Sequence, residues 1–432
     1  MRIGIMAFGS DGEIQPHVEL AIALAKRKHQ VEIFIIALRN RDYSTLNKIE
    51  GITVVQVPYP NDKMAEAYPS KEFWNFSHSE FYYYFDSQFK LIRSHLRRYA
   101  NKMVKSNDIV IGNRQVYPLR FSAEAAGIPY ISLSFEHAFI KSGFYPPQTV
   151  EEGTYEENLE AWRKAEEFSN SMYLPEINEY RKLFNLPPAA DYHSQVLYSN
   201  KLNLVSFSNH LFNNKIDWES NHKLCGYFNA SHRNIDWEMP VSLEEFINAG
   251  EAPVCFTLGS LMEYESEPGH IHSLIADSVK KSGCRAIVLS DWAGGLQPGK
   301  NIFYTGGFVN YARLFPHCSL VVHHGGVGTL HCVAASGVPA LIIAYGFDQF
   351  SNAKLLIQTG ICRNLISRKE LTAQKLAIAI KESLNDPQLA ARSKELAKKI
   401  GSEDGLTEAV NTIENYFSIL EKTHRIRIIT EG

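Results

Sequence analysis

The sequence predicts an α/β protein built from two doubly wound domains. Three observations lead to this prediction: apolar runs of strand length recur along the chain, helical segments alternate with them, and the alternation stops and restarts once. The chain has 432 residues, enough for two or three domains that each bury a core of their own.

The first half opens with a βαβ unit. Residues 2–8 read as a buried strand, a glycine-containing loop follows at 9–16, and a helix is expected from about 16 to 28 before a strand at 31–38. This order implies parallel strands joined by right-handed crossovers. The same half continues with expected helices at 80–105 and 118–126. Its further expected strands are at 52–57, 108–112, 129–134 and 203–207.

The alternation is interrupted at 229–252, where no clear strand is found, and restarts at 253. The second half has an expected helix at 270–282 and strands at 253–258, 284–290, 301–305, 318–322 and 338–343. We therefore expect an N-terminal domain at 1–228 and a linker at 229–252. A C-terminal domain at 253–404 and a C-terminal helix with a tail at 405–432 are expected to follow.

Composition excludes several classes of protein. The net charge of −3 gives no reason to expect a nucleic-acid partner. None of the six cysteines forms a CxxC pair, which favours buried thiols over disulfides or zinc. The first apolar run is too short for a signal peptide, and no stretch has the roughly 20 apolar residues that span a bilayer. These features predict a cytoplasmic protein.

The most informative stretch is 319–353, in which a strand ends, a glycine-rich turn follows and a helix begins. Glycines at such a turn let the backbone N–H groups and the positive end of the helix dipole approach an anion. The turn predicts a diphosphate site, to which either histidine before it adds a donor; the alternative is a tight strand–helix turn with no ligand. The residues concerned are His323, His324, Gly325, Gly326, Gly328 and Thr329.

Asp348 and Gln349 follow the next expected strand at its carboxyl end. Ligands of open α/β sheets bind at that edge, and a carboxylate beside an amide suits neighbouring sugar hydroxyls. We interpret the two residues as donor-sugar contacts; the alternative is a helix N-cap.

Together, the turn and the Asp-Gln pair resemble the C-terminal signature of the family 1 glycosyltransferases. The resemblance is strongest to the branch of bacterial antibiotic glycosyltransferases and sterol glucosyltransferases, whose first N-terminal loop is also similar to Gly9–Pro16. It implies the GT-B fold, in which two Rossmann-like domains face each other across a cleft. It also implies that the C-terminal helix returns to the N-terminal domain.

The resemblance implies roles for individual residues. His323, Gly326, Gly328 and Thr329 match the phosphate contacts, and Ser260 matches a second phosphate contact. The donor-sugar pair is matched by Asp348 and Gln349, and the loop that holds the nucleotide base by Phe308 and Val309.

Inverting sugar transfer needs a base that takes the proton from the acceptor hydroxyl. In this branch the base is an Asp on the first loop, and the matching residue here is Glu13, one methylene longer. Asp11 is the other carboxylate of the loop and the alternative base. A solvated loop charge is the alternative reading for both residues.

The acceptor region is the least defined. The aromatic segment 73–85 includes Trp74, Phe76 and Tyr83 and fits a packed core, an apolar acceptor cleft or a face in contact with lipid. His137 follows a strand and is a weaker acceptor candidate, with a structural histidine as the alternative.

We therefore expect an inverting enzyme that transfers a hexose, with glucose favoured, from a UDP-sugar to a lipophilic or aromatic hydroxyl. A dTDP-sugar remains open as the donor. No Asp-x-Asp run or clustered ligand set points to a metal, and no cofactor is expected beyond the nucleotide sugar. The alternatives are a nucleotide-sugar 2-epimerase of the same fold and a nucleotide-sugar-binding protein without a base. The oligomeric state is not readable from the sequence.

Overall fold

The computed structural model describes most of the chain, namely residues 1–38, 41–61, 63, 78–148, 150–212, 216–229, 237–259, 268–290, 300–346 and 348–431. Within its helices, the side chains at 78–86, 88, 421 and 423–431 lie outside the description.

The N-terminal half folds around a parallel sheet in the order β3-β2-β1-β4-β5-β6-β7. Long apolar runs form its centre, because a strand covered by helices on both faces must be apolar along its length. Its strands are β1 (Arg2–Gly9), β2 (Gln30–Ala37), β3 (Ile52–Gln56), β4 (Ile109–Gly112), β5 (Tyr130–Ser134), β6 (Asn203–Val205) and β7 (His222–Leu224).

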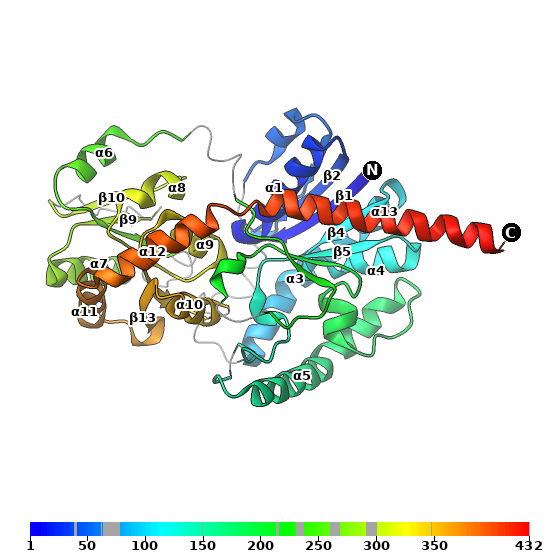
Figure 1. Cartoon of the computed structure of the whole chain (residues 1–432). Helices are drawn as coiled ribbons and strands as arrows, with labels where there is room; N and C mark the ends of the chain where they lie inside the picture. The colour runs from blue at the N-terminus through cyan, green and yellow to red at the C-terminus, as the bar shows by residue number, and fades with distance from the viewer. Residues whose placement is uncertain are drawn as a thin grey trace.

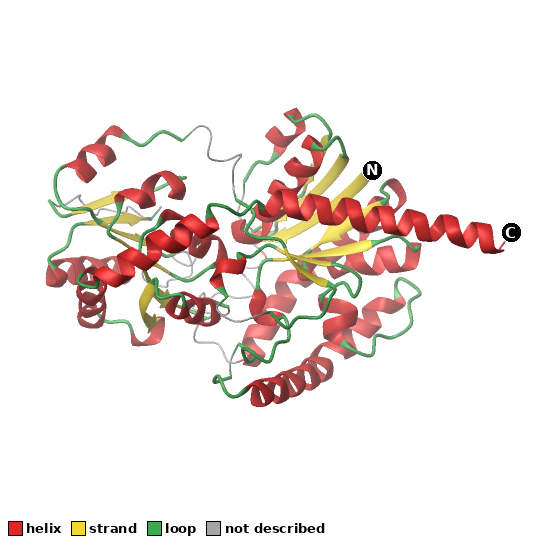
Figure 2. Cartoon of the chain, in the orientation of Figure 1, coloured by secondary structure: helices red, strands yellow, loops and turns green. Residues whose placement is uncertain are grey.

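The C-terminal half has a second parallel sheet, in the order β10-β9-β8-β11-β12-β13. Figure 2 shows the two groups of strands well separated, each flanked by helices. The strands are β8 (Val254–Thr257), β9 (Ala286–Leu289), β10 (Ile302–Thr305), β11 (Leu320–His323), β12 (Ala340–Ala344) and β13 (Cys362–Ser367).

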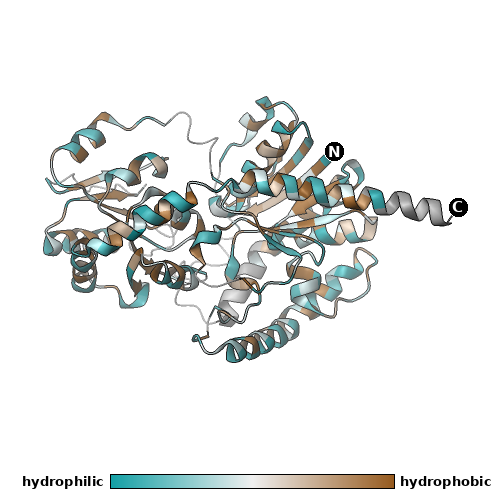
Figure 3. Ribbon diagram, in the orientation of Figure 1, coloured by the Kyte–Doolittle hydropathy of each residue, from teal (hydrophilic) through white to brown (hydrophobic). Residues whose placement is uncertain are grey.

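Helices cover the sheets, and in Figure 3 the strands are mainly brown while the helices carry teal on their outer faces. The helices are α1 (Asp11–Lys26), α3 (His78–Ser106), α4 (Tyr117–Ala126), α5 (Tyr155–Lys182), α6 (Val241–Asn248), α7 (Pro268–Ser282), α8 (Tyr311–Leu314), α9 (Val327–Ser336), α10 (Gln349–Gln358), α11 (Ala373–Leu384), α12 (Pro387–Ile400) and α13 (Gly405–Glu431). Single-turn segments are η1 (Ser44–Lys48), η3 (Arg114–Val116), η4 (His137–Phe139), η5 (His193–Leu197), η6 (Asn209–Leu211), η9 (Phe315–His317) and η10 (Arg368–Glu370).

The last helix, α13, crosses from the C-terminal half back to the N-terminal domain and runs along it (Figure 1). Ala409, Val410 and Ile413 belong to the same buried cluster as the core of α1 and the first sheet. At the surface, Glu414 accepts hydrogen bonds from Arg27 and His29. The predicted return of the C-terminal helix is confirmed.

Two strands were missed in the sequence, β7 and β13, and both lie at the edge of a sheet. An edge strand is partly exposed, so it needs no continuous apolar run: β13 carries Arg363 and Asn364, and β7 has only three residues. The expected linker also contains a helix, α6.

Helix α1 begins at Asp11, five residues earlier than expected, so the expected loop 9–16 is mostly the first turn of a helix. The reason is a capping box: Ser10 is the N-cap, and the Glu13 side chain accepts a hydrogen bond from the Ser10 N–H. The start of α1 therefore fixes the position of the candidate base.

Candidate active site

Glu13 lies half-buried at the carboxyl edge of the first sheet, directly after β1. One carboxylate oxygen accepts from the Ser10 N–H at 2.6 Å, and the other accepts from Gln115 Nε2 at 2.6 Å. Burial raises the pKa of Glu13, the Ser10 hydrogen bond opposes that change, and the charge of Glu136 raises the pKa further. A carboxylate with a raised pKa is a better proton acceptor, which suits a general base.

Asp11, the alternative base, has a different environment. Its carboxylate is 2.5 Å from the Arg41 guanidinium in an ion pair on the first turn of α1. The Asp11 carboxylate is therefore bound to a cation, the Arg41 guanidinium. The Glu13 carboxylate accepts hydrogen bonds from a neutral amide and a backbone N–H instead. The geometry favours Glu13 over Asp11 as the base.

A group of charges surrounds Glu13. Arg114, which follows β4, forms an ion pair with Glu136, which follows β5, at 3.2 Å, and stacks over the Phe139 ring. Sequence reasoning missed Arg114, Gln115 and Glu136. Their signal was position, because each follows a parallel strand that ends at the same sheet edge as β1.

The charges of Glu136 and Arg114 also affect the pKa of Asp348 on the C-terminal domain. Burial raises the pKa of Asp348 to about 7, and the next largest cause is the charge of Glu136 on the other domain. The Arg114 guanidinium opposes the shift. The edge of the first domain that carries the candidate base therefore faces the start of α10, where the donor-sugar pair was predicted.

The glycine-rich turn lies between β11 and α9. Gly326 is the N-cap of α9, and no side-chain hydrogen bond among the described residues caps this helix. Gly325 has a φ of +87°, which favours glycine, and the space beside it is filled by Gln349 and Ile342. The first-turn N–H groups of α9 have no partner inside the helix and are oriented to meet an anion.

The two histidines of the turn are buried and differ in their contacts. His323 Nδ1 accepts from the Gly325 N–H at 3.1 Å, so Nε2 carries the proton; that buried Nε2 has no partner among the described residues. Burial lowers the pKa of His323 to about 3 and that of His324 to about 4, so both rings are neutral. His323 is thus a neutral donor whose Nε2–H has no acceptor in the described part of the chain.

His324 fills the space between two turns. A Cβ on Gly326 would lie 2.3 Å from its Nε2, and a Cβ on Gly259 would lie 2.8 Å from its Cε1. The loop after β8 and the turn before α9 therefore meet around this ring. Ser260, the predicted second phosphate contact, comes directly after Gly259 and lies outside the described residues.

Asp348 and Gln349 open α10, and neither side chain is simply exposed. Asn352 Nδ2 donates to Asp348 Oδ2 at 2.7 Å and to the Gly325 carbonyl at 2.9 Å, which links the Asp348 carboxylate to the glycine turn. Gln349 is buried, and its Oε1 accepts from the Tyr345 N–H at 2.8 Å. Asp348 is therefore the more accessible member of the pair.

The other predicted contacts lie around this centre. Phe308 and Val309 follow β10; Phe308 is 46% exposed, and Val309 packs partly on the core of the C-terminal domain. An exposed aromatic ring at this edge suits stacking on a nucleotide base. Trp74 and Phe76 lie outside the described residues, as does the side chain of Tyr83.

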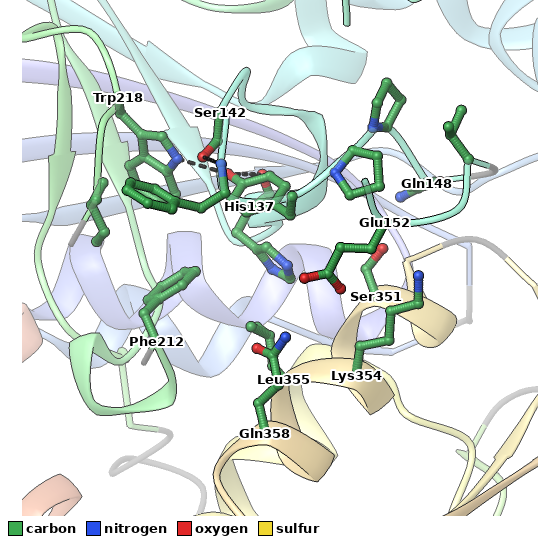
Figure 4. Close-up of a pocket in the computed structure, with 16 residues that line it drawn as sticks. His137, Ser142, Gln148, Glu152, Phe212, Trp218, Ser351, Lys354, Leu355 and Gln358 are labelled. Carbon is green, nitrogen blue, oxygen red and sulfur yellow. Dashed lines mark hydrogen bonds between the residues drawn. The ribbon is translucent and has the colours of Figure 1, made fainter. Parts of the chain in front are cut away.

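His137 lines a pocket between the loops of the N-terminal domain and α10. Figure 4 shows His137 between α10 and the N-terminal loop that carries Ser142 and Gln148. Phe212 and Trp218, from the segment after β6, and Lys354, from α10, line the same pocket. The ring makes edge contacts with Tyr145 and Phe212 and is 2% exposed. These contacts fit a structural histidine better than an acceptor contact, although Nδ1 has no partner among the described residues.

Comparison with solved structures decides the architecture. The chain matches the glycotransferase of kitacinnamycin with a TM-score of 0.68 at 17% identity, over 96% of this chain and 98% of that one. It matches the glycosyltransferase VinC, solved in complex with dTDP, with a TM-score of 0.64 at 18% identity, over 96% and 99% of the two chains. The chain has the GT-B fold.

Sequence comparisons place this GT-B chain near the predicted branch. Residues 300–416 match the family model of the erythromycin biosynthesis protein CIII-like, C-terminal domain. The chain is 24% identical to a sterol 3-beta-glucosyltransferase of Debaryomyces hansenii, over 95% of this chain and 26% of that protein. It is 25% identical to the O-mycaminosyltylonolide 6-deoxyallosyltransferase of Streptomyces fradiae, over 61% and 59%. These matches confirm the resemblance to sterol and antibiotic glycosyltransferases.

The GT-B chain spans only about a quarter of the length of that sterol glucosyltransferase. Within the part of the chain that the structure describes, no helix is long and apolar enough to cross a membrane. Over the same residues, no three His, Cys, Asp or Glu side chains are grouped so as to hold a metal ion.

Proposed function

We propose that this GT-B protein is an inverting glycosyltransferase that moves a hexose from a nucleoside diphosphate to a hydroxyl of a small acceptor. One arrangement supports it above all others. On one domain lie a neutral histidine donor and a helix start that no described side chain caps. A hydrogen-bonded carboxylate, Glu13, lies on the facing edge of the other domain.

In this mechanism each domain has one task. The first turn of α9 and His323 Nε2–H bind the diphosphate, and Asp348 accepts hydrogen bonds from the sugar hydroxyls. Glu13 takes the proton from the acceptor hydroxyl while the oxygen of that hydroxyl forms a bond to the anomeric carbon. The bond from that carbon to the diphosphate breaks, and the diphosphate leaves with the electron pair, stabilised by the N–H donors.

The choice of substrates rests on the resemblance to the family 1 glycosyltransferases and on the relatives. We propose UDP-glucose as the donor, with a dTDP-sugar as the alternative, because relatives include both a sterol glucosyltransferase and a structure holding dTDP. The proposed acceptor is a lipophilic or aromatic hydroxyl compound. The base-stacking role of Phe308 and the phosphate role of Ser260 belong to the same proposal.

The test is acceptor-dependent nucleotide release. The purified chain is incubated with UDP-glucose or dTDP-glucose and a panel of sterols and phenols, while free nucleotide and glycoside mass are measured. Nucleotide release and a hexose-sized mass gain that both need an acceptor support the proposal. Epimerised sugar or binding without any transfer across the panel contradicts it.

The location of the donor is tested separately with a crystal soaked in UDP. We expect the diphosphate against the first turn of α9 and His323. Density against residues 1–200 instead contradicts the assignment of the donor site.

A further inference from the structure

The Glu13 side chain is held by a chain of amides that starts from a backbone carbonyl. Asn113 is buried, and its Nδ2 donates to the Phe8 carbonyl at 3.2 Å and to Gln115 Oε1 at 3.0 Å. A carbonyl can only accept, so it fixes which end of the Asn113 amide faces it. Gln115 must then turn its Nε2 to Glu13, which it reaches at 2.6 Å.

This arrangement leaves the carboxylate able to work as a base. Among the described residues, each oxygen of Glu13 accepts one hydrogen bond, Oε2 from the Ser10 N–H and Oε1 from Gln115 Nε2. An ionised carboxylate has about four acceptor sites, so sites remain for an incoming hydroxyl. The Gln115 amide cannot accept the proton that Glu13 takes up, so Gln115 does not relay it.

We propose that Gln115 is the positioning residue of Glu13, and that Asn113 sets the direction of the Gln115 amide. The inference rests on the proposed function, in which Glu13 is the base. It assigns the loop after β4 the task of aiming the carboxylate and keeping it ionised.

Several charged or titratable groups face Glu13. Glu136 raises its pKa and Arg114 lowers it, while Gln115 and the Ser10 N–H lower it by hydrogen bonding to the ionised form. On α1, Asp11 is paired with Arg41, and His17 Nδ1 donates to the Glu13 carbonyl at 2.7 Å; burial lowers the pKa of His17 to about 4. Asp348 faces the same group from the other domain.

Because Gln115 lowers the pKa of Glu13 and Glu136 raises it, removing each in turn should shift the titration of Glu13 in opposite directions. Gln115→Ala removes a donor to the ionised form, so the acidic limb of the kcat/KM profile should move to higher pH by about one unit. Glu136→Gln removes a negative charge, so the same limb should move to lower pH. Turnover of Gln115→Ala should fall about tenfold, because the carboxylate is no longer aimed.

Two further variants test the geometry. Gln115→Glu keeps the shape of the side chain but replaces the donor with a like charge, and should give the largest upward shift. Asn113→Ala leaves Gln115 in place but frees its amide to rotate, and should give a smaller upward shift than Gln115→Ala. Circular dichroism and thermal melting establish that each variant is folded.

A second readout does not depend on activity. Carboxyl ¹³C NMR of Glu-labelled protein, with the Glu13 signal identified by its loss in Glu13→Gln, gives the titration of Glu13 directly. An upward shift in Gln115→Ala supports the inference even with no substrate known. An unchanged titration in folded Gln115→Ala overturns the inference, whereas wild-type turnover in Glu13→Gln overturns the proposed base.

Discussion

The helices α1 and α9 start in the same way and end up with opposite properties. Each follows a buried strand through a glycine turn at the carboxyl edge of a parallel sheet. At the start of α1, Glu13 occupies the third helical position and closes a capping box with Ser10. At the start of α9, the N-cap is Gly326, the first turn has no acidic residue, and the third position is Thr329.

The difference explains why we propose one turn as a base site and the other as an anion site. At the start of α1, the N–H of the N-cap residue Ser10 already donates to the Glu13 carboxylate, whose charge would repel a diphosphate. At the start of α9, no described side chain caps the helix, so its N–H groups and its dipole suit the proposed diphosphate. One residue at the third helical position, Glu13 in α1 or Thr329 in α9, therefore separates the two proposed functions.

The largest expected effect comes from removing the base while keeping the cap. Glu13→Gln should lower turnover by roughly 10²–10⁴, the usual contribution of a positioned base, with little change in donor affinity. Gln completes a capping box as Glu does, so α1 should still form. Steady-state kinetics and calorimetric titration of donor measure the two quantities.

Asp11→Asn is the matched control, since it neutralises the neighbouring carboxylate. It should retain most of the turnover. If Asp11→Asn abolishes turnover and Glu13→Gln does not, the base is Asp11.

The next effect comes from making α9 resemble α1. Thr329→Glu places a carboxylate at the third position of α9, where it competes with the diphosphate for the same N–H groups. Donor affinity should fall about a hundredfold, because juxtaposed like charges cost several kcal/mol. Binding of UDP measured by calorimetry tests this.

Thr329→Gln has the same size without the charge and should lose much less affinity. Equal losses in the two variants, both shown to be folded by circular dichroism, would mean that bulk at this buried position and not charge is responsible.

A smaller effect concerns the pH dependence of stability. The Asp348 pKa is raised to about 7, so its contribution to folding is present in full below its ordinary value of 3.8 and is lost as pH rises through about 7. Asp348→Asn removes this loss. The Tm difference between variant and wild type should therefore move in favour of the variant between pH 4 and pH 8. A Tm difference between variant and wild type that stays constant over this range would show that the pKa of Asp348 is not raised.

The smallest expected effect is that of chelation. If the α9 turn and His323 meet the diphosphate charge by themselves, turnover in EDTA should equal turnover without it. Loss of turnover that Mn²⁺ or Mg²⁺ restores would show that the start of α9 is not sufficient.

The sequence by itself determined the two domains and the glycine turns. Buried parallel strands need continuous apolar runs, and turns that approach an anion need glycine, so both leave a local pattern in the chain. The sequence also placed Glu13 after β1 and Asp348 after β12, because motif and strand end lie within a few residues of each other.

Only the tertiary structure decided what surrounds these residues. Gln115 reaches Glu13 across 102 positions of sequence, and Glu136 influences Asp348 from the other domain. Such contacts depend on strand order, which places β4 and β5 beside β1, and on how the two sheets face each other. Edge strands and polar contacts between loops are partly exposed and have no required periodicity, so no local pattern in the sequence specifies them.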